Sequence, residues 1–101
     1  MSLKQKTLNI SGTKYLIQEI PADYYLNLFD NSKDENGNLK TGEYMKKLIE
    51  PCLISPKMQI NDFTGKISTL RAIVREIEKL VLGDEVSVEE EKNVQKPENK
   101  G

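Results

Sequence analysis

The stretch TLNISGTKYLIQEI, residues 7–20, limits the possible folds more than any other part of the chain, because it predicts a β-hairpin. In its first arm, Leu8 and Ile10 alternate with polar residues, as in a strand with one buried face. Ser11 and Gly12 then form a two-residue turn, in which glycine supplies the positive φ that hairpin turns require.

The second arm of this hairpin carries apolar side chains on both faces. We expect Leu16 and Ile20 on one face, and Tyr15 and Ile17 on the other. A two-stranded hairpin is unstable alone in water, so helices from the rest of the chain must cover it. The sequence therefore predicts an α+β fold, with an N-terminal two-stranded β-hairpin packed with about three α-helices.

The segment after the hairpin, ADYYLNLFD, predicts a first helix that begins at Pro21, because the fixed φ of proline suits the first helical position. A helix that rests on one core needs an apolar stripe of roughly 100°. At about 100° per residue, the apolar side chains here cover about 200° of the helix. They are Tyr24, Tyr25, Leu26, Leu28 and Phe29.

This apolar excess makes the first helix the candidate functional surface. We expect Tyr25, Leu28 and Phe29 to pack inward, while Tyr24 and Leu26 flank that face and are the better candidates for contact with another chain. The aromatic side chains suit a protein partner, since tyrosine buries a large area with modest loss of entropy. The candidate partner-binding set is thus Tyr24, Leu26, Tyr25 and Phe29, and the competing interpretation is that all of them belong to the core.

The polar loop that follows, residues 30–42, contains an approximate EF-hand pattern at SKDENGNLKTGE. Asp34, Asn36 and Glu43 occupy the third, fifth and twelfth places of a calcium loop, but Ser32 stands where the first aspartate is expected. Two interpretations stay open: a weak metal site formed by these three residues, or a linker whose Asn, Asp and Gly serve turns. We favour the linker.

Two further helices complete the predicted fold. Thr41 is placed to cap the second helix, and Pro51 to end or kink it. The segment ISPKMQINDF predicts an irregular connector, after which Ser68 caps a third helix that Gly83 ends. On the solvent-exposed face of this third helix, two pairs have the i,i+3 spacing of ion pairs, Arg75–Glu78 and Glu76–Lys79. The apolar stripes are Tyr44, Met45, Leu48, Ile49 and Cys52 in the second helix, and Leu70, Ile73, Val74, Ile77, Leu80 and Val81 in the third.

Composition argues against catalysis, cofactors and nucleic-acid binding. The 101 residues include no histidine, and Cys52 is the single cysteine, for which we expect a buried thiol. The 15 basic and 16 acidic residues give a net charge of −1, without the basic excess of a nucleic-acid binder. No catalytic pair of carboxylates is identifiable, and no apolar run has the length of a signal peptide or a membrane span. We expect a cytosolic protein that is not an enzyme.

Charge divides the chain into a body and a tail. Residues 84–101 hold six acids and three lysines, with only three valines as apolar residues. Such a segment has too little apolar surface to offset its chain entropy. We expect residues 1–83 to form one small α+β domain and residues 84–101 to form a disordered acidic tail.

The order of these elements also carries a family resemblance. The hairpin LNISGTKYLIQEIP leads into ADYYLNLFD, and in YMKKLIEPCLISPKMQINDF a helix, a Pro-Lys step and an Asp-Phe follow in order. Over about residues 7–83 the chain resembles the small tail assembly chaperones of long-tailed phages and prophages of Gram-positive bacteria.

This resemblance implies a function without catalysis. Such chaperones bind the long, helical, apolar tape measure protein and keep it soluble while tail tube proteins polymerise around it. It implies these two partners, a place in the bacterial host cytoplasm, absence from the mature virion, and, in many members, a longer frameshifted form. A homo-oligomer is compatible with it. The alternatives are the calcium-binding module and a structural tail or connector component that stays in the particle.

Overall fold

The structure, a computed structural model, describes residues 3–83. It confirms the α+β class, the N-terminal hairpin and the three helices, and adds a third strand and a 3₁₀ helix. The predicted acidic tail, residues 84–101, lies outside the described residues. In chain order the elements are β1 (Gln5–Ile10), β2 (Thr13–Gln18), α1 (Ala22–Asp30), α2 (Thr41–Cys52), β3 (Leu53–Ser55), η1 (Ile60–Phe63) and α3 (Ile67–Leu82).

The hairpin has the predicted turn. β1 pairs antiparallel with β2, and Ile10 lies opposite Thr13 across the two-residue connection. Ser11 and Gly12 both have positive φ, 52° and 85°, as a type I′ turn requires at its two central positions.

The core side of the sheet is the one that carries Tyr15 and Ile17, both of which are buried, whereas Leu16 between them is partly exposed. Leu8 lies opposite Tyr15 and is buried on the same side. Ile20, expected on the face of Leu16, follows the end of β2 at Gln18 and turns into the core instead.

The expectation of an irregular connector over residues 54–63 is wrong at both ends. β3 pairs antiparallel with β2, so that Leu53 lies opposite Ile17 and Ser55 opposite Leu16, and completes a sheet of order β1-β2-β3. At the other end, INDF forms η1, whose start is fixed by the backbone N–H of Gln59 donating to the Asp62 carboxylate at 2.8 Å. Pairing with β2 therefore orders a segment whose own sequence has no strand periodicity.

The predicted N-caps Thr41 and Ser68 are also wrong. Lys40 and Lys66 occupy the N-cap positions, and Thr41 and Ser68 lie inside the first turns. The backbone explains the early start of α3: the Lys66 N–H donates to the Phe63 carbonyl at the end of η1, so the chain enters the helix directly from the preceding 3₁₀ turn.

The predicted helix ends agree better with the structure. α2 ends at Cys52, one residue after Pro51, and the Lys57 ammonium donates to the Glu50 carbonyl at 2.9 Å there. Gly83 ends α3 with a φ of 79°, and its N–H donates to the Lys79 carbonyl at 3.1 Å.

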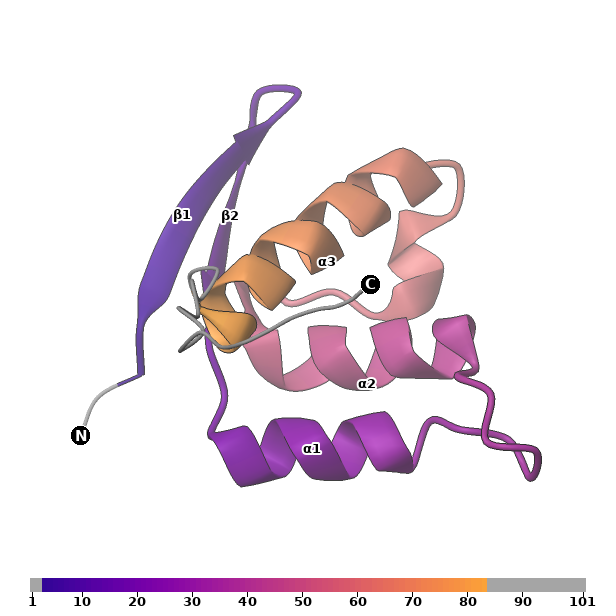
Figure 1. The fold of residues 1–101 in the computed structure, drawn as a ribbon. Coiled ribbons are helices and arrows are strands. Elements are labelled where there is room, and N and C mark those ends of the chain that lie inside the picture. Colours follow the sequence, from indigo (N-terminus) through magenta and orange to yellow (C-terminus); the bar gives the residue numbers. More distant parts are fainter. Residues whose placement is uncertain (1–2, 84–101) are drawn as a thin grey trace, which may run out of the picture.

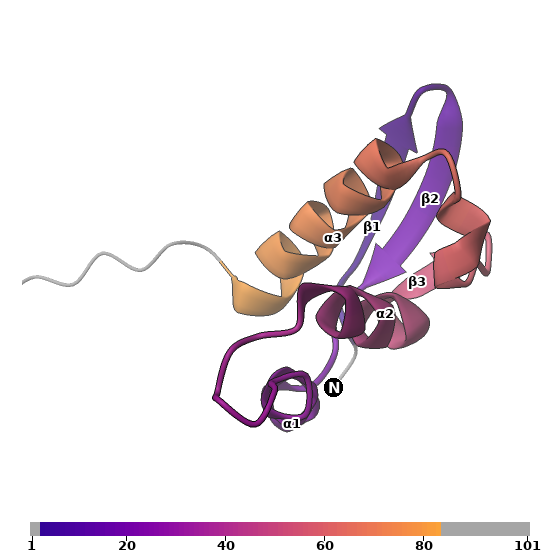
Figure 2. The same cartoon turned by 90° about the vertical axis from the view of Figure 1, so that its right-hand side faces the viewer.

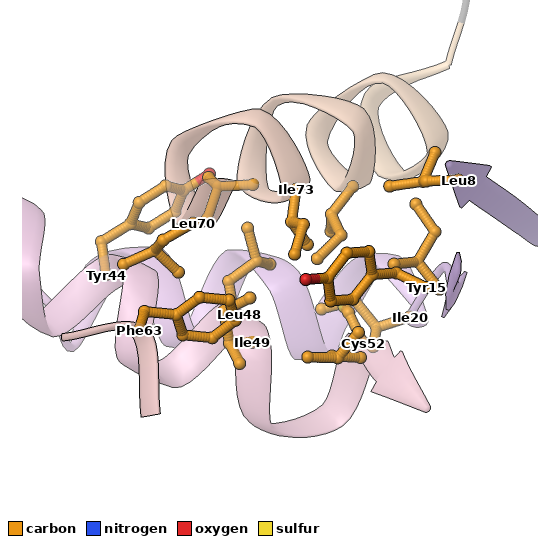
Figure 3. Packing of buried hydrophobic residues seen from close by; sticks show 14 of the residues in the cluster. Leu8, Tyr15, Ile20, Tyr44, Leu48, Ile49, Cys52, Phe63, Leu70 and Ile73 are labelled. Atoms are coloured by element: carbon orange, nitrogen blue, oxygen red, sulfur yellow. The ribbon is translucent and has the colours of Figure 1, made fainter. Parts of the chain in front are cut away.

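The core lies between α2, α3 and the sheet. Figure 3 shows Leu8, Tyr15 and Ile20 at one end of this cluster, and Tyr44 and Phe63 at the other. Cys52 is fully buried as expected, and this burial raises the pKa of its thiol to about 12. The thiol therefore stays protonated, which makes it a poor nucleophile.

The helices form layers. α3 lies along one face of the hairpin, α2 lies between α3 and α1, and α1 is the outermost helix (Figures 1 and 2). On the side of the sheet that faces α3, the Lys6 ammonium lies 2.9 Å from the Glu76 carboxylate and joins β1 to α3. No helix in residues 3–83 combines the length and the apolar character needed to cross a membrane.

Candidate partner-binding surface

α1 is attached to the body by one stripe of side chains. Leu28 is its only buried residue, and Tyr25 and Phe29 are partly buried beside it, which is the inward face expected from the helical spacing. At the end of α1, the Lys47 ammonium from α2 donates to the Asn31 carbonyl at 2.9 Å. α1 thus rests mainly on α2.

Tyr24 and Leu26 remain outside this contact. Tyr24 is 49% exposed and Leu26 is 61% exposed. At about 100° per residue, they lie roughly 160° apart around the solvent side of the helix, one on each flank of the packed stripe. We call these two side chains the α1 flanks. The interpretation that the entire apolar arc of this helix belongs to the core is therefore excluded.

An aromatic cluster holds α1 in place. Tyr25 and Phe29 stack with ring centroids 6.1 Å apart, and Tyr44 of α2 meets both rings edge-on at 6.3 and 5.8 Å. Edge-to-face pairs of this kind add about 0.5–1.5 kcal/mol beyond the area they bury. The Lys33 ammonium lies 5.1 Å from the centroid of Phe29 and covers the cluster from the loop. Tyr25 and Phe29, both in the predicted binding set, are thus engaged within the fold.

A chain of hydroxyl groups extends from this cluster to α3. The Tyr44 hydroxyl donates to the Glu78 carboxylate at 2.7 Å, and the Tyr25 hydroxyl lies 2.9 Å from the Tyr44 hydroxyl. Because the Tyr44 hydroxyl uses its one hydrogen in the bond to Glu78, Tyr25 is the donor in the second bond. Burial above all, then the bonds to Tyr25 and Glu78, raise the pKa of the Tyr44 phenol well above its ordinary value.

The sequence offered no signal for this link, since Tyr44 and Glu78 are 34 residues apart. Glu78 was expected to pair with Arg75, but among the described residues it accepts a hydrogen bond from the Tyr44 hydroxyl and forms no ion pair. The other expected pair is present, with Glu76 and Lys79 3.3 Å apart.

We expect replacement of Tyr44 by phenylalanine to lower the free energy of unfolding by about 1–3 kcal/mol, because Glu78 and the Tyr25 hydroxyl lose their partner. Tyr44 stays neutral in the folded state, whereas an unfolded tyrosine ionises near pH 10, so the parent protein loses stability as the pH rises above about 10. Urea unfolding at about pH 8 and about pH 11 should show a smaller alkaline loss for Tyr44→Phe. Equal losses in the two proteins would contradict this assignment.

The loop between α1 and α2 uses its polar groups to hold its own shape. The Asp34 carboxylate accepts the backbone N–H groups of Asn36 and Asn38 at 2.8 and 2.9 Å, and Lys33 forms a β-bridge with Leu39. Ser32 is buried and donates to the Leu28 carbonyl at 2.6 Å. These are the bonds expected of the linker interpretation, in which Asp and Asn serve turns.

Within residues 3–83, no three or more His, Cys, Asp or Glu side chains gather where they could hold a metal ion. No such group includes Asp34 or Glu43, the two acidic residues of the calcium alternative. Comparison of the chain with models of known protein families, with curated proteins and with solved structures found no match.

Proposed function

We propose that this protein is a tail assembly chaperone of a long-tailed phage or prophage, which binds the tape measure protein and keeps it soluble while the tail tube forms. The observation that carries the proposal is the exposure of Tyr24 and Leu26 on the outermost helix. It supports the function that the resemblance of residues 7–83 implies. The protein would then act in the bacterial host cytoplasm and be absent from the finished particle.

The position of α1 suits this task. A chaperone for a long apolar helix needs apolar surface on a small body that does not lose its own core when a partner binds. Leu28 and the aromatic cluster attach α1 to α2, so the α1 flanks can contact another chain without disturbing that packing. Tyrosine and leucine at such a surface bury apolar area on binding, and the tyrosine hydroxyl can keep its contact with water.

Co-expression with the tape measure protein of the same phage tests the proposal. We expect the partner to appear in the soluble fraction only when this protein is present, and the two to elute together from a sizing column. An insoluble partner without a complex would contradict the proposal. Mass spectrometry of purified virions tests the structural alternative, because a chaperone should be scarce in them and a tail or connector component abundant.

A further inference from the structure

A second surface, separate from the α1 flanks, lies between the start of α2 and α3. It is a groove of about 290 Å³. Its apolar lining comes from Leu39, Met45 and Val74, with the ring of Tyr44 beside them. Arg71, Arg75 and Glu78 of α3 also line it. The groove therefore combines an apolar surface with charged groups from a single helix.

The charged side chains that line this groove are two arginines and one glutamate, so they leave a net positive charge. Arg71 and Arg75 are four residues apart, so both lie on one side of α3, and both are exposed. In residues 3–83 neither guanidinium forms an ion pair, and the Glu78 carboxylate accepts a hydrogen bond from the Tyr44 hydroxyl. The groove thus suits a ligand that carries carboxylates next to small apolar side chains.

The same side of α3 leads from the groove to the end of the helix. Arg71, Arg75, Glu78 and Leu82 follow each other at intervals of four, three and four residues, which places them in one row. Leu82 is 63% exposed and extends the apolar surface to the last turn. Gly83 then ends the helix, and the chain continues from this point.

We propose that residues 84–91 of this chain, DEVSVEEE, fold back along this row and occupy the groove. They contain five carboxylates, no basic residue and two valines, which complements the two arginines and the apolar lining. The segment is also long enough to extend to Arg71. Arg71 is 12 residues before Gly83, about 18 Å along a helix, whereas eight extended residues span up to about 26 Å. The triplet Glu89–Glu91 pairs with Arg71 and Arg75, and the valines cover Val74 and Leu82.

The test of this docking uses no tape measure protein, so its outcome does not depend on the proposed chaperone function. The probe is a nitroxide spin label on Ser87→Cys in the full chain. Cys52 does not compete for the label, since it is fully buried and its thiol is protonated. We expect labelling to reduce the amide NMR signals of Leu39, Val74 and Arg75 strongly, and those of Ser11 and Gly12 in the hairpin turn little.

Two variants in the full chain make the test specific. Arg71→Gln with Arg75→Gln, or glutamine at all three positions 89–91, should restore the lost signals of the groove, whereas Lys14→Gln on the hairpin should leave them reduced. Signal loss confined to Leu82 and Gly83, or unchanged in both variants, would overturn the proposal. To detect contacts between copies, chains that carry the spin label but no ¹⁵N are mixed with ¹⁵N chains that carry no spin label. Loss of the groove signals in that mixture would assign the groove to a second copy and also overturn the proposal.

Discussion

Replacing Phe63 by alanine should lower the free energy of unfolding by about 3–5 kcal/mol, the largest effect we expect from a single change in the core. Phe63 is fully buried at the end of η1 and fills the core beside Tyr44 and Leu48 (Figure 3). The side chains around the ring relax only partly when it is removed, so a cavity remains and adds to the lost burial. A body of about 80 residues has a marginal stability to begin with, and most of it would be lost.

Urea unfolding followed by circular dichroism measures this loss. Ile67→Ala is the matched control, because Ile67 is a large apolar residue close to Phe63 in the sequence but is 51% exposed at the start of α3. Its replacement should cost well under about 1 kcal/mol, as is usual for surface positions. If Phe63→Ala unfolds at the same urea concentration as the control, η1 does not close the core in the way described.

Phe63 also illustrates what the sequence predicts and what it does not. The hairpin and the three helices follow from local signals, namely alternation, a turn glycine and apolar stripes at helical spacing. β3 and η1 have three and four residues, too few to show any periodicity. Leu53 is fully buried because β2 pairs with it, and β2 lies more than thirty residues earlier in the chain. Such elements depend on contacts that no short window of sequence contains.

The predictions of Thr41 and Ser68 as N-cap residues are wrong for a related reason. Threonine and serine are good N-cap residues, but the preference amounts to about 1 kcal/mol. At Ser68 it is overridden by the path of the chain from η1, which begins α3 at Ile67. The prediction that Gly83 ends α3 was correct because a positive φ strongly favours glycine, and that requirement is local.

The two surfaces differ in how far the sequence predicts them. The exposure of Tyr24 and Leu26 follows from helix geometry alone, since an arc of about 200° cannot be covered by one neighbour. The groove beside Arg71 and Arg75 depends on how α2 and α3 lie against each other, and the Tyr44–Glu78 bond depends on the same packing. These relations appear only once the helices are placed in space.

The second large effect follows from the proposed chaperone function and concerns the α1 flanks. Replacing Tyr24 and Leu26 together by glutamine should abolish solubilisation of the tape measure protein while the fold stays intact, because both side chains are exposed and glutamine is a good helix former. The change leaves the net charge unaltered, so a loss cannot be attributed to electrostatics. Co-expression followed by separation of soluble and insoluble fractions measures it, and thermal unfolding of the variant alone confirms that stability is kept.

Single variants and a matched control locate the contact. Ile67→Gln replaces an equally exposed apolar residue away from α1, and should solubilise the partner as well as the parent does. Tyr24 and Leu26 lie on opposite flanks of α1. Either single change will therefore weaken binding of a partner that contacts both flanks, whereas only one of them will weaken binding of a partner that contacts one flank. If the double variant solubilises the partner as well as the parent does, α1 is not part of the interface. Equal losses in the double variant and in Ile67→Gln would mean that binding depends on exposed apolar area in general, and not on this helix.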